Sequence, residues 1–157
     1  MDLNQKIEKV IKEIGNTPDK LIEVLIEVQA QSEGNYISEE ALRIIAKKLN
    51  VSLSKAYGVA SFYSMLSTKK RGKYVIQICN SAPCYLNGGK EITEIFKDVL
   101  GIKMGGITED RLFSLEFTSC IGACNKAPAI KVNDQVYGNL NREKILTLVN
   151  SIREGEK

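Results

Sequence analysis

Four cysteines in two pairs, together with the absence of histidine, constrain this 157-residue chain more than any other feature. The first pair is Cys79 and Cys84, spaced C-x4-C, and the second pair is Cys120 and Cys124, spaced C-x3-C. A chain without imidazole has no histidine to act as a general base, a haem ligand or a zinc ligand. Any metal in this protein is therefore held by sulfur or oxygen.

Each pair follows a segment with strand character. Residues 73–78 are short and rich in β-branched side chains, and residues 112–117 alternate apolar and polar side chains. A helical pattern lies between them, and a strand–helix–strand unit makes its two strands parallel neighbours. The two pairs are therefore expected on loops at the same edge of a sheet. Four converging thiols at such a place favour a two-iron cluster.

Other interpretations of the cysteines compete with this one. Structural zinc also takes four cysteines, although its sites are found mainly in short modules that need the metal to fold. Two disulfides require an oxidising compartment, and a redox-active dithiol has the C-x-x-C spacing that neither pair shows. The spacing alone favours iron and sulfur over zinc, and zinc stays the alternative.

The first half of the chain is predicted to be entirely helical. Apolar residues recur at helical spacing over residues 3–14, from Thr17 towards Gly34, from Ser38 to Leu49 and over residues 52–65. Thr17 and Ser38 are typical first residues of helices. The predicted helices form a bundle of about 70 residues.

From residue 71 onward the pattern predicts strand, helix, strand, strand, strand and helix. The dipeptide Asn133-Asp134 favours a hairpin between the last two strands, and Asn141 caps the last helix. This order is typical of a thioredoxin-like domain. We expect an α+β fold in which an N-terminal helical domain (1–70) precedes a thioredoxin-like [2Fe–2S] domain (71–157).

The charge pattern excludes some classes of partner. The net charge is only +3, and the one local excess, residues 69–73, is interpreted as a polar turn rather than as a nucleic-acid patch. No apolar run approaches the roughly 20 residues that span a bilayer. The first residues lack the basic and apolar regions of a signal peptide. We therefore expect a cytoplasmic protein that neither inserts into a membrane nor binds nucleic acid.

Three motifs around the cysteines resemble those of a known family. They are CNSAPCYLNGG (79–89), SCIGACNKAP (119–128) and VNDQVYGNL (132–140), and the helical segment GVASFY (58–63) also fits. Together they resemble the 24-kDa subunit family of NADH dehydrogenase (complex I). That family includes the small subunits of NAD(P)-reducing and electron-bifurcating hydrogenases and of NAD-dependent formate dehydrogenases.

The resemblance implies that all four cysteines bind one [2Fe–2S] cluster and that the chain transfers electrons. It implies that FMN and NAD(H) are bound by a larger flavoprotein subunit, within a hetero-oligomeric complex that has further iron–sulfur subunits. This chain would then be a non-catalytic subunit without catalytic residues of its own. It has no G-x-G-x-x-G motif after a strand, as a dinucleotide site would require.

The helical half is expected to dock on the flavoprotein. By residue type, Tyr57, Phe62 and Tyr63 are candidate anchors of that interface, although helical aromatic residues are more often part of a core. The short, lysine- and isoleucine-rich chain indicates a bacterial subunit. Among the complexes of the family we favour a soluble, electron-bifurcating or NAD(P)-reducing hydrogenase, and complex I is the alternative. A zinc-stabilised thioredoxin-like interaction module is the alternative of a different class.

Overall fold

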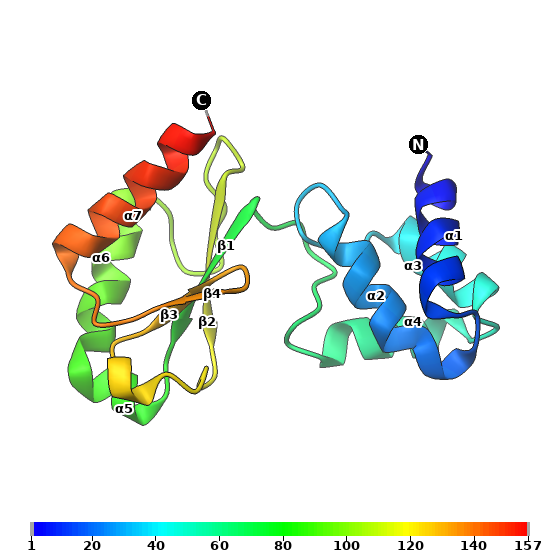
Figure 1. Cartoon of the computed structure of the whole chain (residues 1–157), viewed down its shortest axis with the longest axis horizontal. Helices are drawn as coiled ribbons and strands as arrows, with labels where there is room; N and C mark the ends of the chain where they lie inside the picture. Colours follow the sequence, from blue (N-terminus) through cyan, green and yellow to red (C-terminus); the bar gives the residue numbers. More distant parts are fainter. Residues whose placement is uncertain (1, 157) are drawn as a thin grey trace. The chain divides into compact units, whose positions relative to one another are not determined.

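The computed structural model describes residues 2–156 of the chain with their side chains. The chain divides into two compact units, and the division lies between Arg71 and Gly72. The boundary expected from the sequence, between residues 70 and 71, lies one residue earlier. Each unit has its own hydrophobic core. Figure 1 shows the helices and strands of both units.

The N-terminal unit is helical, as predicted. Its elements are α1 (Leu3–Ile14), the 3₁₀ turn η1 (Pro18–Lys20), α2 (Leu21–Ala30), α3 (Glu39–Lys48) and α4 (Leu53–Phe62). Side-chain oxygens begin several of these helices, because Ser38 accepts a hydrogen bond from the Ala41 amide and Ser52 accepts one from the Lys55 amide. The apolar faces of the four helices share one core, which includes Ile7, Val24, Leu25, Ile45 and Leu49.

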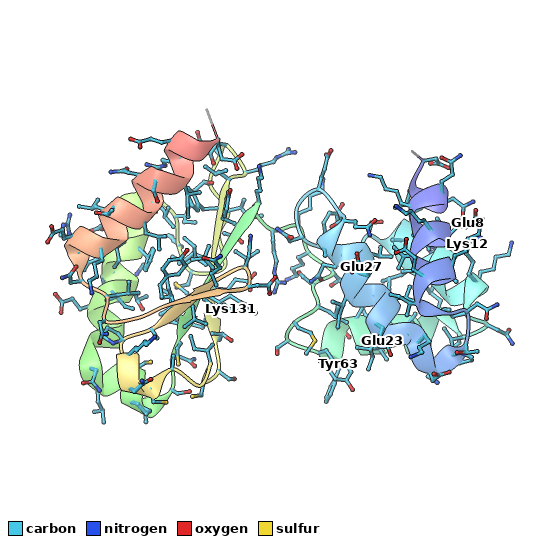
Figure 2. All side chains as sticks on the ribbon, in the orientation of Figure 1. Glu8, Lys12, Glu23, Glu27, Tyr63 and Lys131 are labelled. Carbon is cyan, nitrogen blue, oxygen red and sulfur yellow. The ribbon has the colours of Figure 1, made fainter. Side chains whose placement is uncertain are left out.

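Charged side chains join α1 to α3 outside this core. The ammonium group of Lys48 donates to a carboxylate oxygen of Glu8 at 2.6 Å. This hydrogen bond, and then the positive charge of Lys48, hold the pKa of Glu8 below its ordinary value. Lys12 lies one turn beyond Glu8 on α1 and adds to the effect (Figure 2).

Two helix ends and one cap differ from the predictions. The side chain of Thr17 makes no capping hydrogen bond, and a 3₁₀ turn precedes α2. Helix α2 ends at Ala30, four residues before the expected end at Gly34. Helix α4 ends at Phe62, because the chain then turns to bury Leu66 in the core of the unit.

The C-terminal unit has the predicted order of strands and main helices. Its elements are β1 (Tyr74–Cys79), α5 (Ala82–Cys84), the π-helical turn η2 (Tyr85–Gly89), α6 (Lys90–Leu100), β2 (Phe113–Thr118), the 3₁₀ turn η3 (Cys124–Lys126), β3 (Ile130–Val132), β4 (Gln135–Tyr137) and α7 (Arg142–Gly155). The strand order in the sheet is β2-β1-β3-β4. Strand β1 is parallel to β2 and antiparallel to β3, which forms the predicted hairpin with β4. The α+β prediction is confirmed.

Helices α6 and α7 lie together on one side of this sheet (Figure 1). The core between them and the strands includes Ile76, Phe96, Phe113, Leu115 and Val149. Asn141 begins α7 as predicted, since its side-chain oxygen accepts a hydrogen bond from the Lys144 amide. No helix within residues 2–156 is both long enough and apolar enough to cross a bilayer.

The alternation predicted for β2 is only partly matched by burial. Phe113 and Leu115 are fully buried, whereas Phe117, two residues further along the same face, is 50% exposed. The polar Ser114 is buried instead. Burial along β2 therefore decreases towards the end that carries the second cysteine pair.

Candidate iron–sulfur site

The first cysteine pair lies at the end of β1. Cys79 is the last residue of this strand, and Cys84 lies in the helical turn α5 that follows. Both side chains are only 2% exposed. The segment between them was predicted to be a loop, but Ser81 and Pro83 stand at the positions that commonly start a helix, and they do so here.

The second pair follows β2. This strand ends at Thr118, one residue beyond the alternating segment of the sequence, and Cys120 lies in the loop after it. Cys124 begins the turn η3, and the sulfur atoms of Cys120 and Cys124 are 3.5 Å apart. Both of these thiols are exposed. Between them, Gly122 has a φ angle of +80°, which glycine adopts without strain.

The sheet brings the two pairs to the same edge, as the sequence predicted. Cys79 and Thr118 are register partners in the parallel ladder, and the Asn80 amide donates to the Thr118 carbonyl at 3.1 Å. The Cys79 amide donates to the carbonyl of Ala129, which precedes β3. Ile121, from the loop of the second pair, packs against the buried thiols of the first pair.

Hydrogen bonds from the backbone surround the sulfur of Cys79. Burial of this thiol raises its pKa, but amides of Ser81 and Ile121 and the side chain of Cys84 outweigh burial, so that the pKa is lowered. One of these amides belongs to the first loop and the other to the second loop. The thiolate form of Cys79 is therefore stabilised by both loops at once.

The other thiols show that the pairs interact. Burial raises the pKa of Cys84, although the Ala129 amide offsets part of the effect, and the charges of Cys79 and Cys124 raise it further. The pKa of Cys124 is raised first by its hydrogen bond with Cys120, then by the charge of Cys120, and more weakly by burial and by Cys79. One thiolate raises the pKa of another thiol in this way only when the two sulfurs lie close together. Cys124 thus lies within electrostatic reach of both thiols of the first pair, and Cys120 lies beside Cys124.

The donor set fits an iron–sulfur cluster. Four thiols stand in two close pairs, and backbone amides point at two of the sulfurs, as in sites where amides stabilise sulfur ligands. A cluster of two irons takes four cysteine thiolates. Within residues 2–156, no three Cys, Asp or Glu side chains gather in the way that a single metal ion would require.

Three exposed apolar side chains flank the cysteines in the sequence. Tyr85 and Leu86 directly follow Cys84 and are 61% and 80% exposed, and Phe117 lies three residues before Cys120. Neither Tyr85 nor Leu86 was predicted to be a functional residue. Two consecutive large apolar residues in a polar turn were the signal that could have identified them.

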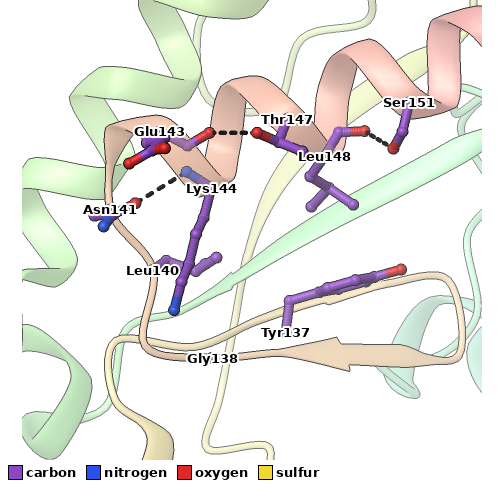
Figure 3. Close-up of a pocket in the computed structure, with 9 residues that line it drawn as sticks. All are labelled: Tyr137, Gly138, Leu140, Asn141, Glu143, Lys144, Thr147, Leu148 and Ser151. Carbon is purple, nitrogen blue, oxygen red and sulfur yellow. Dashed lines mark hydrogen bonds between the residues drawn. The ribbon is translucent and has the colours of Figure 1, made fainter.

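A shallow hollow of about 490 Å³ lies elsewhere in the C-terminal unit, between β4 and α7 (Figure 3). Its lining includes Tyr137, Leu140 and Leu148. The hydroxyl groups of Thr147 and Ser151 donate to carbonyls within α7. The cysteines do not line this hollow.

The candidate docking residues of the helical half differ in exposure. Tyr57 is 54% exposed and Phe62 is 81% exposed, so both side chains are available to a partner. Tyr63 is partly buried and packs against the core of the N-terminal unit (Figure 2 labels it). Met65, which was not among the predicted docking residues, is 56% exposed.

Comparison with known proteins supports the resemblance seen in the motifs. The E subunit of the NADH-quinone oxidoreductase of Rickettsia felis is 38% identical over 125 residues, which are 80% of this chain and 75% of the relative. The E subunit of the same enzyme from Rickettsia bellii is 36% identical over 129 residues, which are 82% of this chain and 77% of the relative. The similarity to the 24-kDa subunit family is confirmed.

Solved structures share the fold. The crystal structure of an NAD⁺-reducing [NiFe]-hydrogenase in its air-oxidized state matches with a TM-score of 0.75 at 20% identity. The match covers 87% of this chain but only 23% of the hydrogenase chain. In the H₂-reduced state the TM-score is 0.77, and 88% of this chain is covered.

A sequence model of one protein family matches most of this chain. The model of the thioredoxin-like [2Fe–2S] ferredoxins matches residues 7–153, which include both cysteine pairs and nearly all of both units. The chain therefore belongs to the thioredoxin-like [2Fe–2S] ferredoxin family.

Proposed function

We propose that this protein transfers single electrons by means of one [2Fe–2S] cluster bound by Cys79, Cys84, Cys120 and Cys124. The observation that carries the proposal is the convergence of the two cysteine pairs at the ends of the parallel strands β1 and β2. The cluster, when bound, accepts and releases one electron without a proton-transfer residue. This chemistry agrees with a chain that contains no histidine.

The surroundings of the thiols support this role. The first pair is buried beneath Ile121, Ala123 and Ala127, which keep water from two of the four ligands. Amides that donate to sulfur stabilise negative charge and raise a reduction potential. The exposed second pair provides a short path between the site and the molecular surface.

The proposed setting is an NAD(P)H-linked oxidoreductase complex. In this setting FMN and NAD(H) are bound by a partner flavoprotein, and the chain serves as a non-catalytic, cytoplasmic electron-transfer subunit. The similarity to curated relatives supports a role in a complex that oxidises NADH, because those relatives are subunits of NADH-quinone oxidoreductase. The hydrogenase favoured by the sequence stays a prediction, since the hydrogenase match at 20% identity supports the fold alone.

The exposed end of α4 is the proposed docking surface for the flavoprotein. Tyr57, Phe62 and Met65 expose large apolar side chains along this helix and the turn after it. We expect Phe62→Ser to reduce the amount of flavoprotein that co-purifies with the tagged chain from its native complex. Ser54→Ala, at an exposed polar position of the same helix, is the control. Equal recovery of FMN with both variants would remove Phe62 from the interface.

Metal and sulfide analysis of the anaerobically purified chain tests the proposal. We expect two irons and two acid-labile sulfides per chain, as the composition of the cluster requires. Zinc in place of iron, reproduced after expression with ample iron and sulfide, would instead indicate a zinc-stabilised interaction module. The identity of the subunits that co-purify with the chain distinguishes a hydrogenase from a quinone-reducing complex.

A further inference from the structure

The segment Gly138–Leu140 leaves β4 and lies against the turn that carries the last cysteine; we call it the clamp segment. The Asn139 amide donates to the carbonyl of Lys126 at 2.6 Å. The Leu140 amide donates to the carbonyl of Pro128 at 3.4 Å. Both acceptors lie within four residues after the last cysteine, so the clamp segment supports this turn through the backbone.

The contact is too close for any side chain at position 138. A Cβ atom built on Gly138 would lie 2.4 Å from the Cβ of Lys126 and 2.6 Å from its carbonyl oxygen. These are atoms at and next to the backbone, so a flexible side chain cannot relieve the overlap. Glycine is therefore required here for close approach to the cysteine turn.

Backbone hydrogen bonds within the turn connect Lys126 to Cys124. The Lys126 amide donates to the Ala123 carbonyl at 2.9 Å, and the Ala127 amide donates to the Cys124 carbonyl at 3.3 Å. A displacement of Lys126 therefore moves the backbone of Cys124. Within residues 2–156, the clamp segment makes no such backbone contact with Cys79 or Cys84.

Helix α7 holds the clamp segment from the other side. The side chain of Lys144 extends from the first turn of α7 towards Gly138 (Figure 3), and its ammonium group donates to the Asn139 carbonyl at 2.9 Å. Asn139 has a φ angle of +51°, a left-handed conformation that asparagine tolerates. Its amide and its carbonyl thereby bind the cysteine turn and α7, respectively.

We propose that Gly138 and Lys144 are positioning residues of the cluster, and that they act by holding the turn of Cys124. The inference rests on the proposed function, because it assumes that Cys124 is a ligand. The exposed second pair has less protein around it than the buried first pair, so the clamp segment supplies support that burial does not provide. Disturbing the clamp segment changes the environment of this ligand and makes the cluster easier to lose.

Gly138→Ala in the full chain is the first test, and Gly155→Ala is its control, because a Cβ at Gly155 would meet no atom within 4 Å. The measurements are the EPR g values of the reduced cluster and the rate at which a chelator removes iron. We expect Gly138→Ala to shift the g values and to release iron about tenfold faster than the wild-type chain. Lower resistance to urea with unchanged g values and an unchanged release rate would show a purely structural role and overturn the proposal.

Lys144→Met provides a second test that adds no bulk, and it decides the outcome if Gly138→Ala does not fold. Release of iron is expected to be about threefold faster in Lys144→Met and to return to the wild-type rate in Lys144→Arg, which restores a donor. Equal rates in all three chains would overturn the proposal. A wild-type chain without iron would overturn the proposed function itself, whereas a wild-type chain with two irons and unaffected variants would overturn this inference alone.

Discussion

Single thiols in the site differ in their access to water, and each is expected to be needed as a ligand. Replacing buried Cys79 by alanine removes one thiolate, and the iron it would bind is left without a full set of ligands. We predict that Cys79→Ala contains much less iron and sulfide than the wild-type chain and that its visible absorbance is lost or altered. Asn80→Ala, at the exposed neighbouring position, is the control. A wild-type spectrum in Cys79→Ala would remove this residue from the ligand set.

Ser114 carries a polar group that the fold leaves unsatisfied. Its hydroxyl is buried in β2, and no hydrogen-bond partner for it lies within residues 2–156. Burying an unpaired hydroxyl destabilises a fold, so Ser114→Ala is predicted to raise the free energy of unfolding by about 1 kcal/mol. Urea unfolding of both chains measures the difference. A clear loss of stability would mean that the hydroxyl makes a stabilising contact.

At the scale of elements, the end of α7 is joined to the start of β1. Glu156 accepts hydrogen bonds from the Lys73 ammonium and the Tyr74 hydroxyl, each at 2.7 Å. The bond from Lys73, and then the bond from Tyr74, lower the pKa of Glu156 below its ordinary 4.5. The folded chain therefore binds this proton more weakly than the unfolded chain does.

The stabilisation from Glu156 is present above the ordinary pKa of 4.5 and is lost as the pH falls through the lower folded value. We predict that acidification through this range lowers the urea midpoint of the wild-type chain more than that of Glu156→Gln. Urea unfolding curves of both chains, recorded at neutral pH and below the ordinary pKa, measure this difference. The same acid sensitivity in both chains would show that the contact does not contribute.

Local signals predicted the elements well where a side chain itself begins the helix. Ser38 and Asn141 cap their helices as expected, because each side-chain oxygen meets an amide of the first turn. Thr17 stands at the predicted N-cap position before Pro18, but its side chain makes no capping hydrogen bond and the first turn is 3₁₀ rather than α-helical. The end of α4 depends on the burial of Leu66, a packing effect that propensity does not contain.

The position of the site in the fold was predictable from the order of strands and helices. A strand–helix–strand unit fixes two parallel strand ends side by side, which brings Cys79 and Cys120 to one edge. The sequence did not predict that Cys84 lies in a helical turn, or that one pair is buried and the other exposed. Those features depend on how Ile121 and Ala129 pack over the first pair, and this packing brings together residues far apart in the sequence.

At the scale of the whole molecule, the two units are predicted to fold as separate bodies. Residues 63–73, between α4 and β1, contain no helix or strand, and Lys69 and Lys70 are exposed there. Limited trypsin treatment is predicted to cut first in this segment and to leave two resistant fragments, with the iron in the C-terminal fragment. Gel electrophoresis, mass spectrometry and iron analysis identify them. Loss of iron on the first cut would show that the cluster requires both units.

The measurement that tests the central claim most directly is EPR spectroscopy of the anaerobically purified chain after reduction with dithionite. If the four cysteines bind one [2Fe–2S] cluster, reduction produces a rhombic signal that integrates to about one unpaired electron per two irons and persists to fairly high temperature. A colourless protein that contains zinc and gives no signal, even after expression with ample iron and sulfide, would contradict the claim.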